Sequence, residues 1–283
     1  MKSLLSIRLK GKDTYCKFSR FGRIIDGFKT KCTSQELIKE VGAEIKYIDI
    51  PANINNQAYK YNIIRSSKRY SPENRYSPEN SYAQRKSILC PCGVRLYDYQ
   101  FLSDFQKRML AFSVVESIRI VLLKSRKSLK KANILVDDGC KAENKFIIEE
   151  LAKEARNIVV LTKDIRKSEK LREFIIYNYG TTLEILHREE DIGEVDFIIS
   201  SEEKAYNCQR IWYLNNFYSP NKEGVFINKV AFKAPWDSKI KLFSPELLGG
   251  ILKDEKKIDI KDLIRKNDII LEEISFNSKD IVI

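Results

Sequence analysis

The sequence is poor in several residues on which specialised functions depend. Its 283 residues include one histidine, six cysteines, seven prolines and eleven glycines. The single histidine, His187, is the only carrier available for a His-based triad or general base. The few glycines and prolines exclude collagen-like and low-complexity chains. The sequence therefore assigns no catalytic residue.

The cysteines are too sparse for a disulfide scaffold. Only Cys90 and Cys92 lie close together, and no second pair completes the four ligands of a structural zinc site. We interpret them as two ordinary thiols around a turn and expect no metal site. Cys16 and Cys32 are available as thiol nucleophiles, although no neighbouring residue in the sequence marks an activated thiolate.

Long apolar runs are also missing. The richest stretch, residues 109–123, is interrupted by Glu116 and Arg119, so it falls short of the roughly eighteen apolar residues of a membrane span. The apolar part of MKSLLSIRLKGK is too short for a secretory signal. With 43% hydrophobic and 32% charged residues, the composition is that of a globular protein. We expect a soluble, cytoplasmic protein without a membrane partner.

Negative charge is scarce in the first half of the chain. Residues 1–131 contain 27 Lys and Arg against 11 Asp and Glu, whereas residues 132–283 contain 24 against 28. The net charges are therefore +16 and −4. An anionic partner such as nucleic acid, attraction between the two halves, and codon bias would each explain this difference. Because no nucleic-acid-binding module is recognisable, we expect weak nucleic-acid binding or none.

Residues 1–100 predict a small basic α+β unit. Residues 4–9 and 43–50 have the pattern of strands, and Ser34 precedes a short predicted helix over residues 35–42. Residues 52–87 are polar and rich in tyrosine, which predicts a flexible loop.

This predicted loop contains the tandem hexapeptide RYSPENRYSPEN at residues 69–80. Each Ser-Pro disfavours helix at the serine. Alternating arginine and tyrosine also suit stacking on single-stranded nucleic acid, although two copies are too few for a repeat fold.

Residues 101–283 predict a second domain that opens with a long buried helix over residues 101–124. Strands that are apolar throughout then alternate with helices, at residues 133–136, 158–161, 182–186 and 196–200. This alternation is typical of a parallel sheet, with the loops after the strands along one edge, where ligands bind. We predict an α/β fold: a Rossmann-like parallel sheet with helices on both faces, plus the small α+β unit.

The loop after the first of these strands resembles the phosphate loop of NAD(P)-binding Rossmann proteins. It consists of Asp137, Asp138, Gly139, Cys140, Lys141 and Ala142. Gly139 and Ala142 match the second and third small positions, and Asp137 replaces the first glycine. The resemblance covers about residues 101–235. It is to the shikimate dehydrogenase and glutamyl-tRNA reductase type, in which a long helix precedes the nucleotide-binding domain.

The same resemblance implies a choice of cofactor. The loop after the second strand consists of Thr162, Lys163 and Asp164, with Arg166 beyond. Basic residues at this place are typical of NADP-binding proteins, whereas an acid that binds the ribose is typical of NAD. Ser200 and Ser201, after the fourth strand, are the small polar type against which a nicotinamide ribose lies.

Two functions follow as alternatives. The first is a nucleotide- or dinucleotide-binding protein with a small-molecule ligand and NADP as the favoured cofactor. The second is a non-catalytic regulatory or interaction protein on a degenerate Rossmann scaffold, because Asp137 and Asp138 would repel a phosphate. A phosphorylatable receiver domain is rejected, since Ser200 stands at the acceptor position. Whether the chain is an enzyme, and whether it forms a homo-oligomer, stays open.

Aromatic residues gather after the fourth predicted strand. We expect a lid over the strand ends, formed by Tyr206, Tyr213, Phe217 and Tyr218. Trp212 and Trp236 are expected in the core or at an interface.

Overall fold

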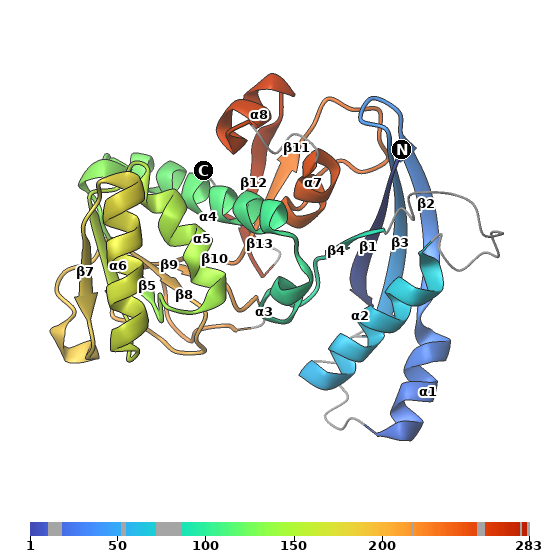
Figure 1. Cartoon of the computed structure of the whole chain (residues 1–283), viewed down its shortest axis with the longest axis horizontal. Coiled ribbons are helices and arrows are strands. Elements are labelled where there is room, and N and C mark those ends of the chain that lie inside the picture. Colours follow the sequence, from blue (N-terminus) through green and yellow to red (C-terminus); the bar gives the residue numbers. More distant parts are fainter. Residues whose placement is uncertain are drawn as a thin grey trace. The chain divides into compact units, whose positions relative to one another are not determined.

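The chain forms two compact units (Figure 1). The computed structural model describes residues 1–10, 19–51, 55–71, 87–216, 218–253, 258–277 and 279–281. The first unit contains Met1–Gln106, Lys233–Asp259 and Leu263–Ile269; the second contains Lys107–Phe232, Ile260–Asp262 and Ile270–Ile283. The chain thus returns to the first unit after the second, whereas we expected one domain from residue 101 onward. Among the described helices, none is long and apolar enough to cross a membrane.

A four-stranded sheet forms the centre of the first unit. Its strands are β1 (Lys2–Lys10), β2 (Lys31–Ile38), β3 (Ala43–Pro51) and β4 (Ile88–Pro91). They lie in the order β2-β3-β1-β4, with β1 parallel to both β3 and β4 and β2 antiparallel to β3. The strands predicted at residues 4–9 and 43–50 are confirmed.

Strand β2 occupies part of the range that we predicted as a helix over residues 35–42, so that prediction is wrong. The residues from Gln35 to Ile38 pair with β3. Ile38 is buried and Leu37 is 47% exposed, an alternation that fits a strand. A helix this short has marginal stability alone, and the pairing with β3 supplies the hydrogen bonds instead. The chain then turns at Gly42, whose φ of +58° favours glycine.

Helices cover this sheet. They are α1 (Arg20–Lys29), α2 (Asn56–Tyr70) and α7 (Pro245–Leu252), while the one-turn helix α3 (Arg95–Asp98) contacts α2. Helix α2 lies inside the range predicted as a loop, and this part of the prediction is wrong. Asn55 caps it by accepting from the amides of Gln57 and Ala58, at 3.0 and 3.3 Å. Ser-Pro disfavours helix only from Ser71 onward, where α2 ends, but the prediction applied this effect to the residues before Ser71 as well.

Residues 72–86, which include most of the tandem hexapeptide, lie outside the described residues, as do Cys16 and Phe217.

Both faces of the first sheet are buried. Leu5 and Ile7 on β1 belong to the apolar cluster that includes Tyr59 of α2. Leu4 points to the other face, where α7 packs. A Cβ atom placed on Gly250 of α7 would lie 2.8 Å from Leu4 Cδ2 and 2.6 Å from Cys90 Sγ. The absence of a side chain at Gly250 therefore allows α7 to lie directly on β1 and β4.

The second unit contains a six-stranded sheet in which every strand pair is parallel. Its strands are β5 (Asn133–Asp137), β6 (Asn157–Leu161), β7 (Leu183–Leu186), β8 (Phe197–Ser200), β9 (Arg210–Tyr213) and β10 (Val225–Ile227). Their order is β10-β9-β8-β5-β6-β7. Counted from β5 and listed from β7, this is 3-2-1-4-5-6, the strand order of the Rossmann fold. The predicted α/β class with a Rossmann-like parallel sheet is confirmed.

The helices of the second unit also follow the sequence pattern. They are α4 (Asp104–Lys124), α5 (Ala142–Ala152) and α6 (Ile165–Tyr179). Helix α8 (Ile260–Lys266) has residues in both units. A small third sheet consists of β11 (Lys229–Lys233), β12 (Ile270–Phe276) and β13 (Lys279–Asp280). The indole nitrogen of Trp212 on β9 donates to Ser117 Oγ on α4 at 3.0 Å. Trp212 is fully buried, which confirms its expected place in the core.

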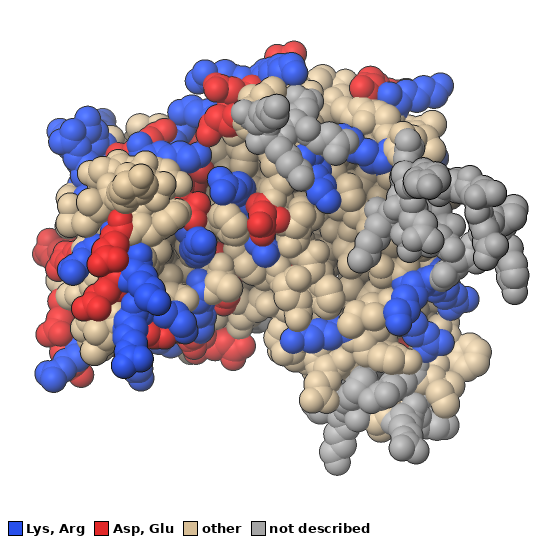
Figure 2. Space-filling view, viewed as in Figure 1, with Lys and Arg blue, Asp and Glu red and all other residues tan. Residues whose placement is uncertain are grey.

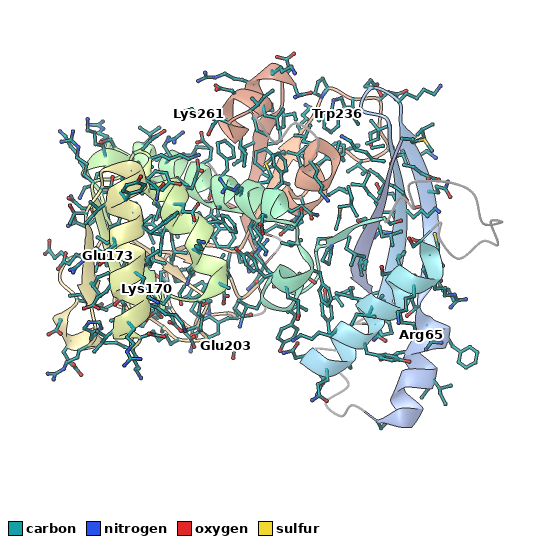
Figure 3. All side chains as sticks on the ribbon, viewed as in Figure 1. Arg65, Lys170, Glu173, Glu203, Trp236 and Lys261 are labelled. Carbon is teal, nitrogen blue, oxygen red and sulfur yellow. The ribbon has the colours of Figure 1, made fainter. Side chains whose placement is uncertain are left out.

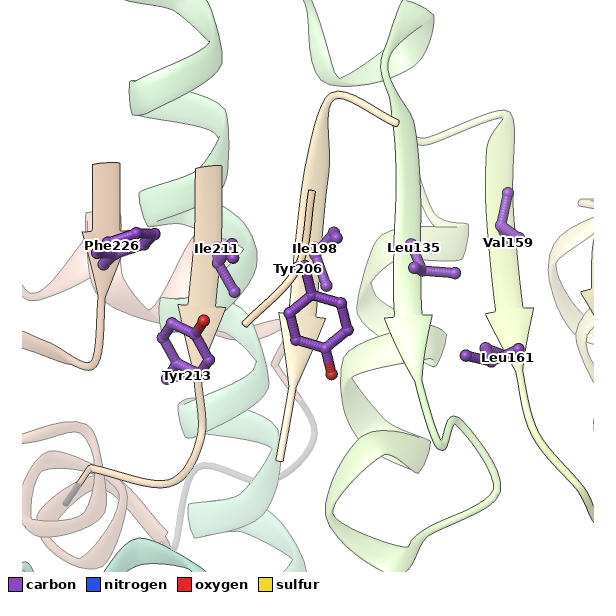
Figure 4. Packing of buried hydrophobic residues seen from close by; sticks show 8 residues of the cluster. All are labelled: Leu135, Val159, Leu161, Ile198, Tyr206, Ile211, Tyr213 and Phe226. Carbon is purple, nitrogen blue, oxygen red and sulfur yellow. The ribbon is translucent and has the colours of Figure 1, made fainter. Parts of the chain in front are cut away.

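One face of the six-stranded sheet is covered by aromatic residues rather than by the expected helices. The crossovers from β7 to β10 contain a short 3-10 turn and no α-helix in their described residues. Tyr206, Tyr213 and Phe226 pack there with aliphatic residues of the strands (Figure 4). The expected lid is therefore wrong for Tyr206 and Tyr213, which belong to the core because their rings fill this face.

Candidate functional site

A cavity of about 650 Å³ lies at the carboxyl ends of β5, β6 and β7 and beside the segment that follows β8. Because parallel strands all end at the same edge, residues distant in sequence meet here. Of the predicted site residues, four line the cavity: Asp137, Asp138, Thr162 and Lys163.

Asp137 ends β5 with a carboxylate that is almost completely buried. The hydroxyl of Tyr206 donates to it, and Lys204 Nζ lies 3.2 Å away. Burial raises the pKa of Tyr206, and the hydrogen bond to Asp137 raises it further. Burial opposes the charge on Lys204, but its bond to Glu189 and the charge of Asp137 raise the pKa of Lys204 overall. Asp137 is thus held between a neutral hydroxyl and a permanent cation.

Asp138 has its own lysine. Lys141 Nζ lies 3.2 Å from the Asp138 carboxylate and also pairs with Glu202. Burial opposes the charge on Lys141, but these two carboxylates raise its pKa overall. Each lysine therefore bridges one acid of the loop to a glutamate, Glu189 or Glu202, so the charge of the acidic pair is offset only in part.

Gly139 is required by packing between α5 and β6. A Cβ atom at this position would lie 2.6 Å from Val160 Cγ1 and 3.1 Å from Ile148 Cδ1. Close contact between helix and strand is one role of the glycines in the Rossmann phosphate loop.

The backbone of this loop is held by a residue that sequence reasoning missed. Asn144 Nδ2 donates to the carbonyl oxygens of Asp137 and Asp138, at 3.0 Å each. Ala142 begins α5, and Lys141 stands at its N-cap without a side-chain capping bond. No side chain caps the start of α5, so the amide groups of its first turn can attract an anion.

After the end of β6, Asp164 and Lys163 have different roles. Asp164 caps α6: it accepts from the amide of Lys167 at 3.0 Å, and its carboxylate lies 2.8 Å from Lys167 Nζ. These bonds lower the pKa of Asp164. Lys163 lines the cavity, whereas Arg166, which we predicted with it, does not.

The remaining predicted residues are not at the cavity wall. Ser200 is fully buried, with its hydroxyl 2.5 Å from that of Tyr206. Ser201 Oγ is buried without a hydrogen-bond partner among the described residues. Burial raises the pKa of the half-buried Cys140 thiol, which disfavours a thiolate.

Sequence reasoning missed two cations and three acids that line the cavity beside His187: Arg188, Lys204, Glu189, Glu190 and Glu202. Arg188 comes two residues after the end of β7. The rule that selected Lys163, position after a parallel strand, would also have found Arg188. Lys204 lies farther from the end of β8, and only the contact with Asp137 identifies it.

Comparisons with known proteins give likenesses of fold. No family model matches the sequence, and no curated protein does. A shikimate dehydrogenase in complex with NADP+ is similar at 15% identity over 72% of this chain and 67% of that one, with a TM-score of 0.32. L-tryptophan dehydrogenase from Nostoc punctiforme is similar at 12% identity over 94% and 77% of the two chains, with a TM-score of 0.37.

Quinate dehydrogenase from Corynebacterium glutamicum, in complex with NAD, is similar at 11% identity over 71% of each chain, with a TM-score of 0.31. The Rossmann-like part of the suspected resemblance is supported by the strand order of the sheet, and the shikimate dehydrogenase type stays a prediction. These likenesses do not establish what this chain binds.

Proposed function

We propose that the second unit binds an adenine dinucleotide, with NADP preferred, in the cavity at its strand ends. The observation that carries this proposal is the position of the cavity. Strands β6 and β7 continue the sheet on one side of β5, and β8 continues it on the other. In open parallel sheets, ligands bind at the point where the strand order reverses, outside the carboxyl ends.

The residues around this point fit a dinucleotide. Gly139 keeps the loop close to β6, and the start of α5 has no side-chain cap. Lys204 and Lys141 offset part of the repulsion between the acidic pair and a phosphate, although each lysine also pairs with a second acid, Glu189 or Glu202. This partial offset weakens the support that the acidic pair gives to a non-catalytic regulatory or interaction protein.

The preference for NADP rests on the end of β6. An NAD-binding protein uses an acid here to bind the ribose hydroxyls. Asp164, the only acid in this loop, is occupied in capping α6. Lys163 and Arg188 line the cavity and would recognise the additional phosphate of NADP. A bound nicotinamide dinucleotide supplies hydride-transfer chemistry, and these residues would serve to bind and orient it.

A thermal-shift series with NADP, NAD, ATP and S-adenosylmethionine tests the proposal. A ligand at a hundred times its dissociation constant stabilises the protein by about 2.7 kcal/mol. We expect the largest shift with NADP. Absence of a shift with both nicotinamide dinucleotides would contradict the proposal.

Two variants then test the assignment of the phosphate site. Lys163→Ala should weaken NADP binding and leave NAD binding nearly unchanged, measured by isothermal titration calorimetry. Arg166→Ala is the matched control, because it removes the same charge from a position outside the cavity. Equal losses for NADP and NAD in Lys163→Ala would show that Lys163 does not recognise the additional phosphate.

A further inference from the structure

The first unit contains a groove between two of its helices. It has a volume of about 910 Å³ and lies between α1, α2 and the start of β2. Tyr61, Arg65 and Arg69 line it from α2. They are spaced four residues apart, so they form one stripe along the helix. Ile24 and Phe28 line the opposite wall from α1.

The groove is lined by cations and lacks acids. Lys31, Arg65 and Arg69 contribute three positive charges, and none of the described residues that line the groove is acidic. Asp26 is the acid of α1, but it is 97% buried and accepts a hydrogen bond from Asn62 at 2.9 Å. Around α2, the face drawn in Figure 2 shows Lys and Arg among uncharged residues, whereas both signs are interspersed over the second unit. The groove therefore attracts anions.

Aromatic rings stand beside these cations. Phe28 is 78% exposed, and the rings of Tyr61 and Tyr70 also line the groove. The guanidinium of Arg69 lies over the ring of Tyr70, 5.3 Å from its centroid. Such rings offer flat apolar surfaces for stacking at the same place where phosphates would be held.

The position of Arg65 depends on a glycine in the opposite helix. A Cβ atom at Gly27 of α1 would overlap the guanidinium of Arg65. The missing side chain thus gives this guanidinium its place between α1 and α2, where it is labelled in Figure 3. The two helices are packed so that a long cation lies in the groove.

We propose that this groove binds single-stranded nucleic acid. Backbone phosphates would contact Lys31, Arg65 and Arg69, and a base would stack on Phe28 or Tyr61. A basic groove lined by aromatic rings is the combination that binds single strands without sequence preference. A duplex does not expose the faces of its bases, and a lipid surface favours a flat or convex face over a groove.

This proposal reverses our expectation, from the sequence, of weak nucleic-acid binding or none. Arg69 and Tyr70 begin the tandem hexapeptide whose alternation suits stacking, whereas the other lining residues, within 24–32 and 61–65, do not stand out in the sequence. Only the packing of α1 beside α2 brings them together. The second segment was also predicted to be a loop, so no helical stripe was visible in it.

Fluorescence anisotropy with the full chain tests the proposal. The probes are a fluorescein-labelled oligothymidylate and a duplex of the same length, each titrated at several salt concentrations. We expect tighter binding to the single strand. Three phosphate contacts at about −0.7 each predict a slope of log affinity against log salt of about −2.

Two charge variants of α2 test the site itself. Arg65→Ala with Arg69→Ala should reduce the salt slope by about 1.4, because two phosphate contacts are lost. Lys60→Ala with Lys68→Ala removes the same charge from the same helix at positions that do not line the groove. This control should keep most of the affinity and the slope.

A third variant removes stacking without changing charge. Phe28→Leu alters an exposed ring, so the fold is retained, and affinity should fall about tenfold, as expected for the loss of one stacked base. It also keeps the proposal testable if the double arginine variant does not fold.

Four results would overturn the proposal. Equal losses in the arginine and lysine double variants, or equal binding of duplex, single strand and heparin, would indicate non-specific attraction of polyanions. Stronger binding to phosphatidylserine–phosphatidylcholine vesicles than to oligothymidylate would make this groove part of a membrane-binding surface. Unchanged affinity in Phe28→Leu together with the double arginine variant would place the nucleic acid elsewhere.

Discussion

Each unit buries an aspartate against a tyrosine, and the two pairs differ by one lysine. In the first unit, Tyr59 donates to Asp98 Oδ1 at 2.5 Å, while Asp98 Oδ2 has no hydrogen-bond partner among the described residues. In the second, Tyr206 donates to Asp137, which also has Lys204 at 3.2 Å. Both carboxyl groups are almost inaccessible to water.

The difference separates two ways of tolerating a buried acid. Burial raises the pKa of Asp98 to about 7, against the hydrogen bond from Tyr59, which lowers it. The fold of the first unit thus favours the protonated form of Asp98, so Asp98 contributes most to stability at low pH. The second unit instead places the ammonium group of Lys204 3.2 Å from the buried Asp137, so this acid has a cation beside it. A buried acid therefore marks a candidate ligand site more clearly when the protein also provides its counter-ion.

The largest expected effect is the dependence on pH of the free energy of unfolding of the first unit. The pKa of Asp98 is about 7 in the folded chain and 3.8 is its ordinary value, so the folded state alone holds the proton between these limits. The free energy of unfolding should fall as pH rises from about 4 to about 7, by about 1.4 kcal/mol for each pH unit in this interval. Asp98→Asn should abolish this dependence and be the more stable protein above pH 7.

Urea unfolding at several pH values measures this effect. Trp236 belongs to the first unit and Trp212 to the second, and they are the only tryptophans. A Trp212→Phe background therefore reports on the first unit through Trp236. If the free energy of unfolding changes with pH in the same way with and without Asp98→Asn, the pKa of Asp98 is not raised.

The second effect concerns the counter-ion of Asp137. Lys204→Met should lower the free energy of unfolding of the second unit by about 3 kcal/mol, because a buried carboxylate loses its cation. Asp137→Asn in the same chain should restore much of this loss, since an amide oxygen still accepts from Tyr206. Urea unfolding in a Trp236→Phe background measures it. A double variant as unstable as Lys204→Met alone would contradict the pairing.

The third effect compares two glycines of the second unit. Gly139→Ala should cost about 2 kcal/mol, because the new methyl group would overlap Val160. Gly193→Ala should have almost no effect on the same urea midpoint, because nothing lies within 4 Å of the position of its Cβ. Equal midpoints for the two variants would show that α5 can move away from β6 without cost.

The smallest effect concerns Asp164. Asp164→Ala should lower the unfolding midpoint slightly through loss of the cap of α6, while Asp164→Ser retains the cap. The ratio of NADP to NAD affinity should stay the same in both variants. A selective loss of NAD binding in Asp164→Ala would instead assign this acid to the ribose.

The strands β5, β6 and β8 were predictable because each contains three or four consecutive apolar residues, a pattern typical of a sheet buried on both faces. Strand β2 was not, because its residues are largely exposed and its pairing with β3 is decided by tertiary structure. Helix α2 was hidden by its polar composition, although Asn55 is a good N-cap.

The candidate site was predictable in outline for a similar reason. Position after a buried strand selected Asp137 and Lys163 correctly as residues of the cavity wall. The partners that change their chemistry, Tyr206 and Lys204, follow β8 in a segment without regular structure. No sequence spacing connects such a segment to the end of β5. The contacts of Tyr206 and Lys204 with Asp137 are therefore visible only in the structure.

The return of α7 to the first unit determines the order in which the protein can be completed at the ribosome. Helix α7 covers Leu4 and Cys90, yet it is synthesised after all six strands of the parallel sheet. The sheet of β1 to β4 therefore emerges with one face uncovered and stays so while the next domain is made. A nascent chain that stalls before residue 245 already contains all six parallel strands, while its first unit still exposes Leu4 on the face that α7 would cover.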